Sequence, residues 1–270
     1  MRIADIREIC REAKKARTVE WIFFEGGEPF LYYPILLKGI KAASEMGFKT
    51  GIVTYPYWAT SIEDATEWLA PMSKLGVSDI SISEDTFHQE KEERDYPTYA
   101  CEAAKRLGVP MGSITIEEPT PNVSDRTGLG GEMVKGGEVM FRGRAVGKLV
   151  EGLPRKPWTE FQKCRHEDLQ NPSRVHIDPF GFIHLCQGIT MGNYKEKPLS
   201  KLIASYNPLS HPICAPLIEG GPAALVEEYG VPHEDSYVDE CHLCYSARLS
   251  LRSRFPKHLA PGHMYGEGEK

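Results

Sequence analysis

The sequence lacks the features of a membrane, secreted or nucleic-acid-binding protein. No apolar run reaches the roughly 20 residues of a transmembrane helix, and residues 1–5 contain no signal-peptide core. The 38 Asp and Glu outnumber the 32 Lys and Arg, which gives a net charge of −6. No overall positive field therefore attracts nucleic acid or anionic lipid. We expect a cytoplasmic protein with neither a nucleic-acid nor a membrane partner.

The sequence also lacks the cysteine density of a disulfide-stabilised protein. It has seven cysteines in 270 residues, an odd number, and no secretion signal. Cysteines are clustered in the C-terminal part, a pattern that indicates metal binding rather than disulfides. Cys10, Cys101 and Cys214 have no partner at metal-ligand spacing, so we expect them to pack in the interior.

Apolar strand-like segments alternate with helix-like segments as far as residue 116. This alternation predicts an α/β fold with a parallel sheet and right-handed crossovers. The periodicity places strands at 19–24, 48–54, 77–83 and 110–116, and helices at 3–16, 33–46, 61–75 and 97–107.

The first predicted strand ends in Gly-Gly-Glu-Pro at residues 26–29, directly before a predicted helix. Glycines let the backbone approach a ligand, and ligands of parallel α/β folds lie at the carboxyl ends of strands. A carboxylate beside two glycines suits an ammonium group on a small ligand. The alternative, a tight turn with a solvated Glu28, stays open at this point.

Residues 24–29 resemble the GGEP motif of radical S-adenosylmethionine (radical SAM) enzymes. Residues 50–54 resemble the third strand of that family, and residues 78–88 resemble the fourth with its S-x-D-x-F-H ending at His88. The resemblance covers most of the chain. It implies that the motif binds the amino group of S-adenosylmethionine and that a serine of the fourth strand contacts its ribose. The implied cofactor-binding residues are Gly26, Gly27, Glu28, Pro29, Ser81 and Ser83.

The resemblance also implies a partial (β/α) barrel of the radical SAM type, to which we assign residues 1–150. In that family a Cys-x-x-x-Cys-x-x-Cys loop after the first strand holds the catalytic [4Fe–4S] cluster, and no such triplet occurs in this sequence. We therefore expect an N-terminally incomplete barrel, either truncated or degenerate. Truncation is favoured because the first helix begins where the absent loop would end.

After residue 116 the periodicity breaks in a stretch rich in Pro, Gly, Asn and Asp. Residues 139–145 then predict a short strand that leads into a helix at 146–151. Arg142 and Arg144 flank the turn between them. They are candidate ligands for a cofactor carboxylate or a substrate anion, or they are ordinary surface arginines.

The C-terminal part contains a candidate four-cysteine site. Residues 175–177 and 182–185 predict a β-hairpin with turn residues at 178–181, and Cys186 ends its second strand. The Cys-x-x-Cys pair Cys241 and Cys244 lets two thiolates face one metal centre, and Cys164 and Cys186 complete the set. From the ligands alone, iron–sulfur and zinc are equally open, and buried cysteines without metal are a third alternative. His166, His184 and His242 are candidate ligands or hydrogen-bond donors beside the site.

These cysteines resemble the SPASM or shorter twitch extension of radical SAM enzymes. No cysteine follows Cys244, so the twitch form with a single auxiliary [4Fe–4S] cluster is the better match. The resemblance implies an iron–sulfur domain at residues 151–256 and favours iron–sulfur over zinc. Residues 257–270 are expected to form a loose tail.

Together these resemblances imply a radical SAM enzyme in its complete form. Such an enzyme uses S-adenosylmethionine to start hydrogen abstraction from a substrate and needs a reducing electron donor. Many relatives with this extension modify peptides or proteins, so a peptide substrate is the first expectation. The catalytic residues remain unknown. Two alternatives stay open: a non-catalytic iron–sulfur or zinc-binding remnant, and an interaction module built on a zinc site.

Overall fold

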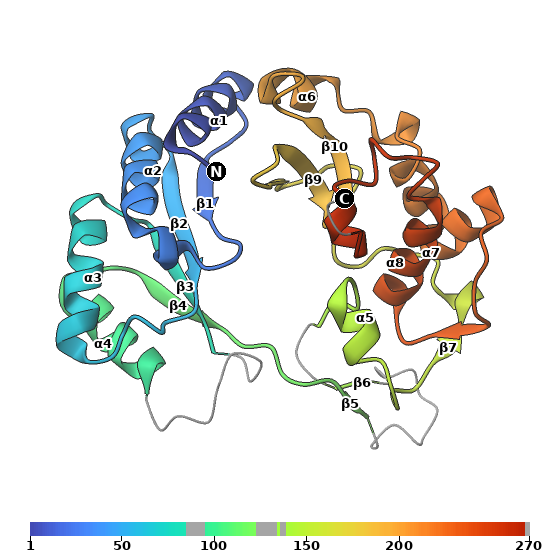
Figure 1. The fold of residues 1–270 in the computed structure, drawn as a ribbon, viewed down its shortest axis with the longest axis horizontal. Coiled ribbons are helices and arrows are strands. Elements are labelled where there is room, and N and C mark those ends of the chain that lie inside the picture. The colour runs from blue at the N-terminus through green and yellow to red at the C-terminus, as the bar shows by residue number, and fades with distance from the viewer. Residues whose placement is uncertain (85–94, 123–133, 136–138, 268–270) are drawn as a thin grey trace. The chain divides into compact units, whose positions relative to one another are not determined.

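The computed structural model describes residues 1–84, 95–122, 134–135 and 139–267, which form two compact units, Met1–Glu117 and Glu118–Lys270 (Figure 1). The division after Glu117 falls earlier in the chain than the domain boundary that the sequence predicted after residue 150. The predicted domain boundary stays a prediction. His88, at the end of the S-x-D-x-F-H motif, lies outside the described residues. None of the helices in the described ranges combines the length and apolar character needed to cross a bilayer.

The first unit contains a parallel four-stranded sheet, as the sequence predicted. Its strands are adjacent in chain order, and every neighbouring pair is parallel. The partial barrel stays a prediction, because the order and direction of these four strands neither require nor exclude a barrel. The strands are β1 (Trp21–Phe24), β2 (Lys49–Thr54), β3 (Asp79–Ser83) and β4 (Met111–Ile114).

Helices precede each strand at nearly the predicted bounds, because the local end signals are strong. The Ser61 hydroxyl accepts the N–H of Asp64 at 3.0 Å and so caps the helix that follows. Gly108 adopts a left-handed conformation with φ of 64° and ends the last helix of this unit. The helices are α1 (Ile3–Ala16), α2 (Tyr33–Glu45), α3 (Ile62–Lys74) and α4 (Tyr96–Leu107).

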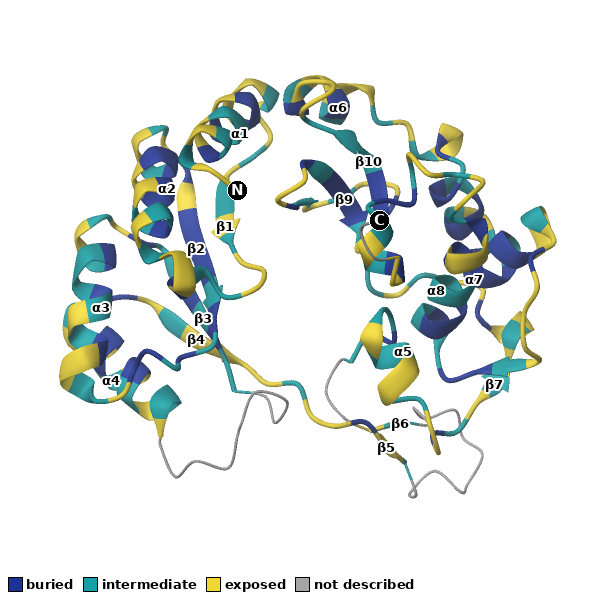
Figure 2. Cartoon of the chain, in the orientation of Figure 1, coloured by how far each residue is buried: buried dark blue, intermediate teal, exposed yellow. Residues whose placement is uncertain are grey.

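The two faces of this sheet have different chemistry. Ile52, Ile80 and Ile82 are fully buried in a core that also contains apolar residues of α2, α3 and α4 (Figure 2). Because side chains alternate along a strand, Ser81 and Ser83 lie on the opposite face, as expected. The strand register places Trp21, Phe23, Gly51 and Val53 on that same face.

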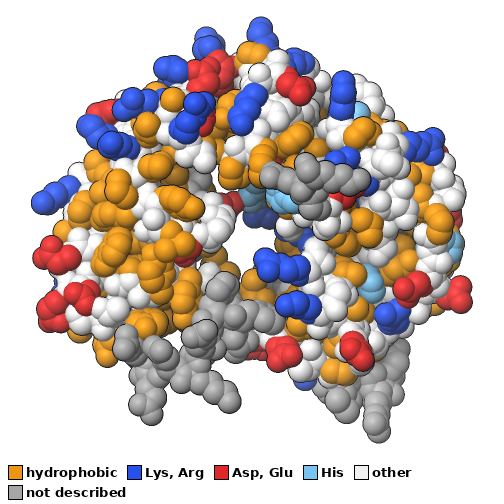
Figure 3. All heavy atoms as spheres, in the orientation of Figure 1, with side chains coloured by type: hydrophobic (Ala, Val, Ile, Leu, Met, Phe, Trp, Pro, Cys, Tyr) orange, Lys and Arg blue, Asp and Glu red, His pale blue; other side chains and the backbone are white. Residues whose placement is uncertain are grey.

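Apolar side chains are exposed beside the glycine turn. Phe23 is 46% exposed, and Leu31 and Tyr32, in the short helix η1 (Pro29–Tyr32), are 66% and 67% exposed. On the face drawn in Figure 3, hydrophobic side chains gather over the middle of the first unit, whereas Lys and Arg lie around α1. Exposed apolar side chains therefore lie on both sides of the glycine turn.

The second unit contains the predicted β-hairpin. Strand β8 (His176–Ile177) pairs antiparallel with β9 (Phe182–Cys186), with His176 opposite His184. A further strand that the sequence did not reveal, β10 (Ile189–Asn193), pairs with β9 and extends the hairpin to three strands. Cys186 therefore lies at the end of the central strand.

Helices make up much of the rest of this unit, and sequence reasoning missed the longer ones. Residues of α7 (Cys214–Tyr229) and α8 (Glu240–Leu251) pack in one apolar core with Leu185 and Ile189. The strand predicted at 139–145 is wrong: Gly143, with φ of 57°, breaks the extended chain, and α5 begins at Arg144. The remaining elements are α6 (Leu199–Ser205), the strand pair β5 (Thr120–Pro121) and β6 (Val134–Lys135), and the pair β7 (Lys156–Pro157) and β11 (Ser236–Tyr237).

The described part of the expected loose tail, residues 257–267, is packed. Leu259, Ala260 and Tyr265 are at most 5% exposed. The N–H of Thr190 donates to the carbonyl of His258 at 2.9 Å, which ties this segment to β10. Three apolar side chains of this segment are buried in the core, and this burial holds the segment in place. The polar composition of the segment gave no sign of it.

A glycine inside α7 determines how the chain approaches Cys164. Gly221, with φ of 67°, lies at a kink in this helix. A Cβ atom built on Gly221 would lie 2.3 Å from the backbone carbon of Gln162 and from the nitrogen of Lys163. The N–H of Ala223 also donates to the carbonyl of Phe161 at 3.1 Å. The segment before Cys164 is therefore fixed against the kink of α7 by backbone contacts.

We expect Gly221→Ala to lower the free energy of unfolding by about 3 kcal/mol, because alanine would meet both a backbone conformation (φ 67°, ψ −160°) that is essentially confined to glycine and a backbone clash. Gly230→Ala is the matched control: Gly230 has φ of 57°, but nothing lies within 4 Å of its added Cβ. The control should lose about 1 kcal/mol. Chemical denaturation measures both variants, and equal losses would show that the close approach at Gly221 carries no cost.

Candidate functional site

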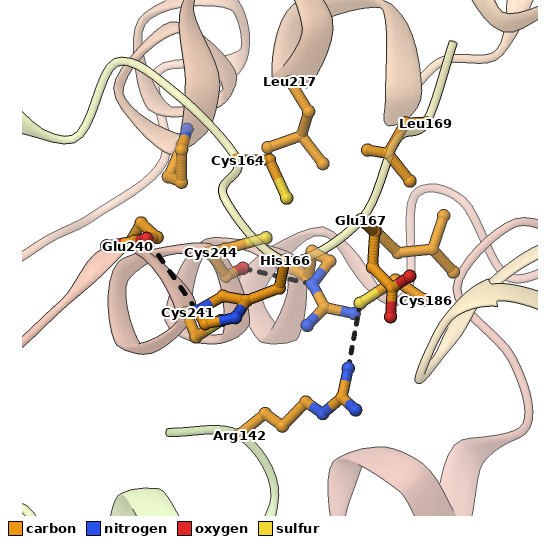
Figure 4. Close-up of a pocket in the computed structure, with 13 residues that line it drawn as sticks. Arg142, Cys164, His166, Glu167, Leu169, Cys186, Leu217, Glu240, Cys241 and Cys244 are labelled. Atoms are coloured by element: carbon orange, nitrogen blue, oxygen red, sulfur yellow. Dashed lines mark hydrogen bonds and ion pairs between the residues drawn. The ribbon is translucent and has the colours of Figure 1, made fainter. Parts of the chain in front are cut away.

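The four cysteines predicted as metal ligands line one small pocket of the second unit (Figure 4). Cys164 comes from the loop after the short helix η3 (Trp158–Glu160), Cys186 from the end of β9, and Cys241 and Cys244 from the first turns of α8. Segments more than 75 residues apart in sequence thus meet here, since Cys164 and Cys241 line the same cavity. Apolar side chains, among them those of Leu169 and Leu217, form the rest of the wall.

The Cys-x-x-Cys pair begins a helix. Asp239 precedes α8, and its carboxylate accepts the N–H of His242 at 2.7 Å, so it caps the helix. Residues three apart in a helix lie on the same face, which directs Cys241 and Cys244 to the same pocket. Their place in the first turns also puts both thiols near the positive end of the helix dipole, which favours thiolates.

The four sulfur atoms do not form a close group of three in the metal-free chain. Among the described residues, which include all four cysteines, no three of these sulfurs lie within 4.8 Å of one another. Four thiolates around one zinc ion, at about 2.3 Å each, lie about 3.8 Å apart. This wider spacing leaves room for a centre larger than one metal ion.

Burial disfavours charge on these thiols. It raises the pKa of the Cys244 thiol to about 11, and the neighbouring Cys186 and Cys164 add to this effect while Arg248 opposes it. Burial also raises the pKa of Cys164 and of Cys241. These three thiols are therefore largely protonated at neutral pH by themselves, but a bound metal centre displaces their protons.

Two arginines supply positive charge at the pocket. The guanidinium of Arg142 donates to the sulfur of Cys186 at 3.1 Å (Figure 4). Arg248 is only 1% exposed and donates to the carbonyl of Gln187 at 2.8 Å and to the Tyr265 hydroxyl at 3.2 Å. Buried cations need nearby negative charge, which thiolates in this pocket would provide. Arg144, the other predicted anion ligand, is exposed.

Sequence reasoning missed Arg248, although a signal for it was present. It follows Cys244 by four positions on α8, so both side chains lie on the same face of that helix. It also missed Asp239 as part of this site. The ligand atoms of Asp239, His166 and Cys241 all lie within 4.8 Å of one another. Burial raises the pKa of the Asp239 carboxyl to about 7.

The hairpin that carries Cys186 is held by a buried carboxylate. One oxygen of Asp178 accepts the N–H groups of Phe180, Gly181 and Phe182 at 2.8–2.9 Å. Its other oxygen lies 3.1 Å from Nε2 of His184, whose Nδ1 accepts the N–H of Gly188 at 3.2 Å. His184 therefore links the turn of the hairpin to the residues after Cys186. His184 does not line the cysteine pocket, whereas His166 does.

The predicted cofactor-binding residues are only partly brought together. A cavity of about 330 Å³ in the first unit is lined by Gly26, Gly27, Glu28 and Ser83, together with residues at the end of β2. Pro29 instead begins η1, and the Ser81 hydroxyl donates to Asp79 at 3.1 Å; neither residue lines the cavity. The remaining lining residues are Leu31, Val53, Thr54, Tyr55 and Tyr57.

Glu28 connects the glycine turn to the neighbouring strand. One carboxylate oxygen accepts the N–H of Phe30 at 2.9 Å and the Thr54 hydroxyl at 2.7 Å, and the other accepts the N–H of Tyr55 at 2.8 Å. Glu28 is thus fixed by protein donors rather than merely solvated. A carboxylate has about four acceptor positions, so the three bonds leave capacity for one further donor such as an ammonium group. Burial and the charge of Glu28 both raise the pKa of the nearby Tyr57.

Comparison with known proteins gives one partial similarity. No protein-family model matches the chain. The chain is 30% identical, over 83 residues, to the protein named "Putative peptide biosynthesis protein YydG" from Bacillus subtilis (strain 168). The similar region covers 31% of this chain and 26% of that protein. The match thus spans about a quarter of the relative's length.

We expect the Asp178 carboxylate to contribute pH-dependent stability. Burial alone would raise its pKa, but the hydrogen bonds from His184 and the backbone lower the pKa below the ordinary value of 3.8. The unfolded chain therefore binds this proton more readily, so the contribution is present above that value and is lost as the pH falls through the folded pKa.

Asp178→Asn should accordingly lower the free energy of unfolding by about 1–3 kcal/mol at pH 7. The difference from wild type should shrink as the pH falls below 3.8, measured by chemical denaturation between pH 7 and pH 3. Asp235→Asn, at an exposed position of the same unit, is the control and should change little. A difference that is independent of pH would rule out the charged form of Asp178 as the stabilising species.

Proposed function

We propose that this chain is a radical SAM enzyme, or the C-terminal portion of one, that acts on a peptide. Its first unit would bind S-adenosylmethionine at the glycine turn, and its second unit would hold one auxiliary [4Fe–4S] cluster. The observation that carries the proposal is the convergence of Cys164, Cys186, Cys241 and Cys244, from three separate segments, on one pocket. Four thiolates are the ligand set of such a cluster.

The spacing and charge of the pocket favour a cluster over a single zinc ion. The structure describes all four cysteines, and no three of their sulfurs lie within 4.8 Å of one another. Sulfur ligands of one bound zinc ion lie closer, about 3.8 Å apart. A cluster bound by four thiolates is an anion, and Arg142 and Arg248 provide two cations beside it. When bound, such a cluster supplies a one-electron redox centre. The hydrogen bond from Arg142 to the sulfur of Cys186 would raise the reduction potential of this cluster.

The first unit offers groups suited to the methionine end of the cofactor. Glu28 is held with a remaining acceptor position, and Gly26 and Gly27 leave the backbone accessible, with no side chain covering them. Ser83 lines the same cavity and would contact a sugar hydroxyl. Ser81 and Pro29 would act only indirectly, through the strand and the turn that they build. The proposed enzyme also needs an external reducing electron donor.

The peptide substrate rests on the similarity to a protein named for peptide biosynthesis. Because the match covers 26% of that protein, the chemistry of the whole relative is carried over only as a proposal. A second candidate is a non-catalytic metal-binding protein. It is favoured by the absence of any Cys-x-x-x-Cys-x-x-Cys triplet from the 270 residues. Cofactor binding at the glycine turn separates the two.

The metal assignment is tested by anaerobic iron and sulfide analysis of the wild-type chain. We expect about four irons and four sulfides per chain, and their loss in Cys244→Ala. Cys101→Ala is the matched control, because Cys101 is exposed on α4, contrary to its expected packing, and should leave the content unchanged. Zinc in place of iron, or equal content in both variants, would refute the four-cysteine cluster.

The cofactor assignment is tested by equilibrium dialysis with labelled S-adenosylmethionine. Glu28→Gln removes the negative charge but keeps an acceptor oxygen, so binding should weaken about tenfold, or about 1.4 kcal/mol. Ser81→Ala, whose hydroxyl faces Asp79 rather than the cavity, should bind as the wild type does. Wild-type protein that binds no cofactor, or equal affinities for all three proteins, would exclude this role for the glycine turn.

A further inference from the structure

A second set of metal-ligating atoms lies at the edge of the cysteine pocket. The imidazole of His166, the carboxylate of Asp239 and the sulfur of Cys241 offer ligand atoms that all lie within 4.8 Å of one another. All three side chains are half-buried. Of the cysteines assigned to the cluster, this group includes only Cys241.

The three groups match the chemistry of a zinc site. Thiolate, imidazole and carboxylate all bind Zn²⁺ at about 2.0–2.3 Å, and three protein ligands with one open position are a known arrangement. In a tetrahedral site such ligand atoms lie about 3.3–3.8 Å apart, so a contraction of about 1 Å suffices. The four sulfurs of the cluster set do not contain a comparably close group of three.

Neighbouring groups would hold two of the ligands in place. Nε2 of His166 lies 3.9 Å from a carboxylate oxygen of Glu240, which is also 3.6 Å from Nε of Arg165. A carboxylate beside a metal-bound imidazole orients the ring and strengthens it as a ligand. Asp239 is fixed by the hydrogen bond that it accepts from the N–H of His242 at 2.7 Å. Figure 4 shows His166 beside Cys241, with its ion pair to Glu240.

We propose that the metal-free chain binds one Zn²⁺ ion through His166, Asp239 and Cys241, and that this site and the four-cysteine cluster exclude each other. On binding, the Cys241 thiol releases its proton and a sulfur–zinc bond takes its place. Because both sites need Cys241, an occupied zinc site removes one of the four ligands that the four-cysteine cluster requires. The exclusion rests on the proposed cluster, whereas the zinc site itself does not.

The zinc site is tested by titrating the full chain, stripped of metal under anaerobic conditions, with Co²⁺ and then displacing it with Zn²⁺. We expect one Co²⁺ per chain with a thiolate charge-transfer band that Zn²⁺ abolishes. His166→Ala and Asp239→Asn should each weaken binding at least tenfold. Asparagine still caps α8, so the second variant keeps the fold of the helix. Cys244→Ala should bind Co²⁺ as the wild type does.

Exclusion is tested by rebuilding the cluster with iron and sulfide after Zn²⁺ has been added. Zinc should block cluster formation in the wild type and not in His166→Ala, which should form the cluster normally. Undiminished Co²⁺ binding by His166→Ala, or loss of Co²⁺ by Cys244→Ala, would overturn the zinc site, since the metal would then use the cysteine set. A wild type that never forms a cluster would refute the proposed function, and the Co²⁺ titration would still decide the zinc site.

Discussion

The cysteine pocket is governed by one electrostatic constraint: thiolates in an apolar pocket need compensating positive charge. Four cysteines meet in a wall that includes Leu169 and Leu217, and burial raises the pKa of three of their thiols. Around them the chain supplies what an anionic centre requires, namely the start of α8 and the guanidinium groups of Arg142 and Arg248. The kink at Gly221 fixes the loop that carries Cys164, and the carboxylate of Asp178 fixes the hairpin that carries Cys186.

The first unit is built differently, because one face of its sheet is buried and a cavity lies at the strand ends. Ile52, Ile80 and Ile82 bury that face against helices, and the glycine turn ends β1 at the edge of the cavity. Glu28 accepts one hydrogen bond from Phe30 within the turn and two from Thr54 and Tyr55 at the end of β2, so the cavity is shaped by backbone as much as by side chains. The two units thus place their polar chemistry at strand ends and helix starts.

The sequence predicted the first unit well because its signals are local. Ser61 and Gly108 mark helix ends, and apolar periodicity distinguishes strand from helix. The second unit was predicted only at its hairpin and its cysteines. Helix α7 was missed because Gly220, Gly221 and Pro222 interrupt it, and its stability comes from tertiary packing. The bonds of Glu28 and the proximity of His166 to Cys241 arise from contacts between distant segments, which no local pattern records.

Iron K-edge X-ray absorption of the anaerobically purified chain tests the central claim, that the four cysteines hold one iron–sulfur cluster, most directly. We expect an iron environment made only of sulfur, with short iron–iron scattering, which disappears in Cys186→Ala as well as in Cys244→Ala. Iron bound by nitrogen or oxygen without iron–iron scattering, or a spectrum that these variants leave unchanged, would contradict it.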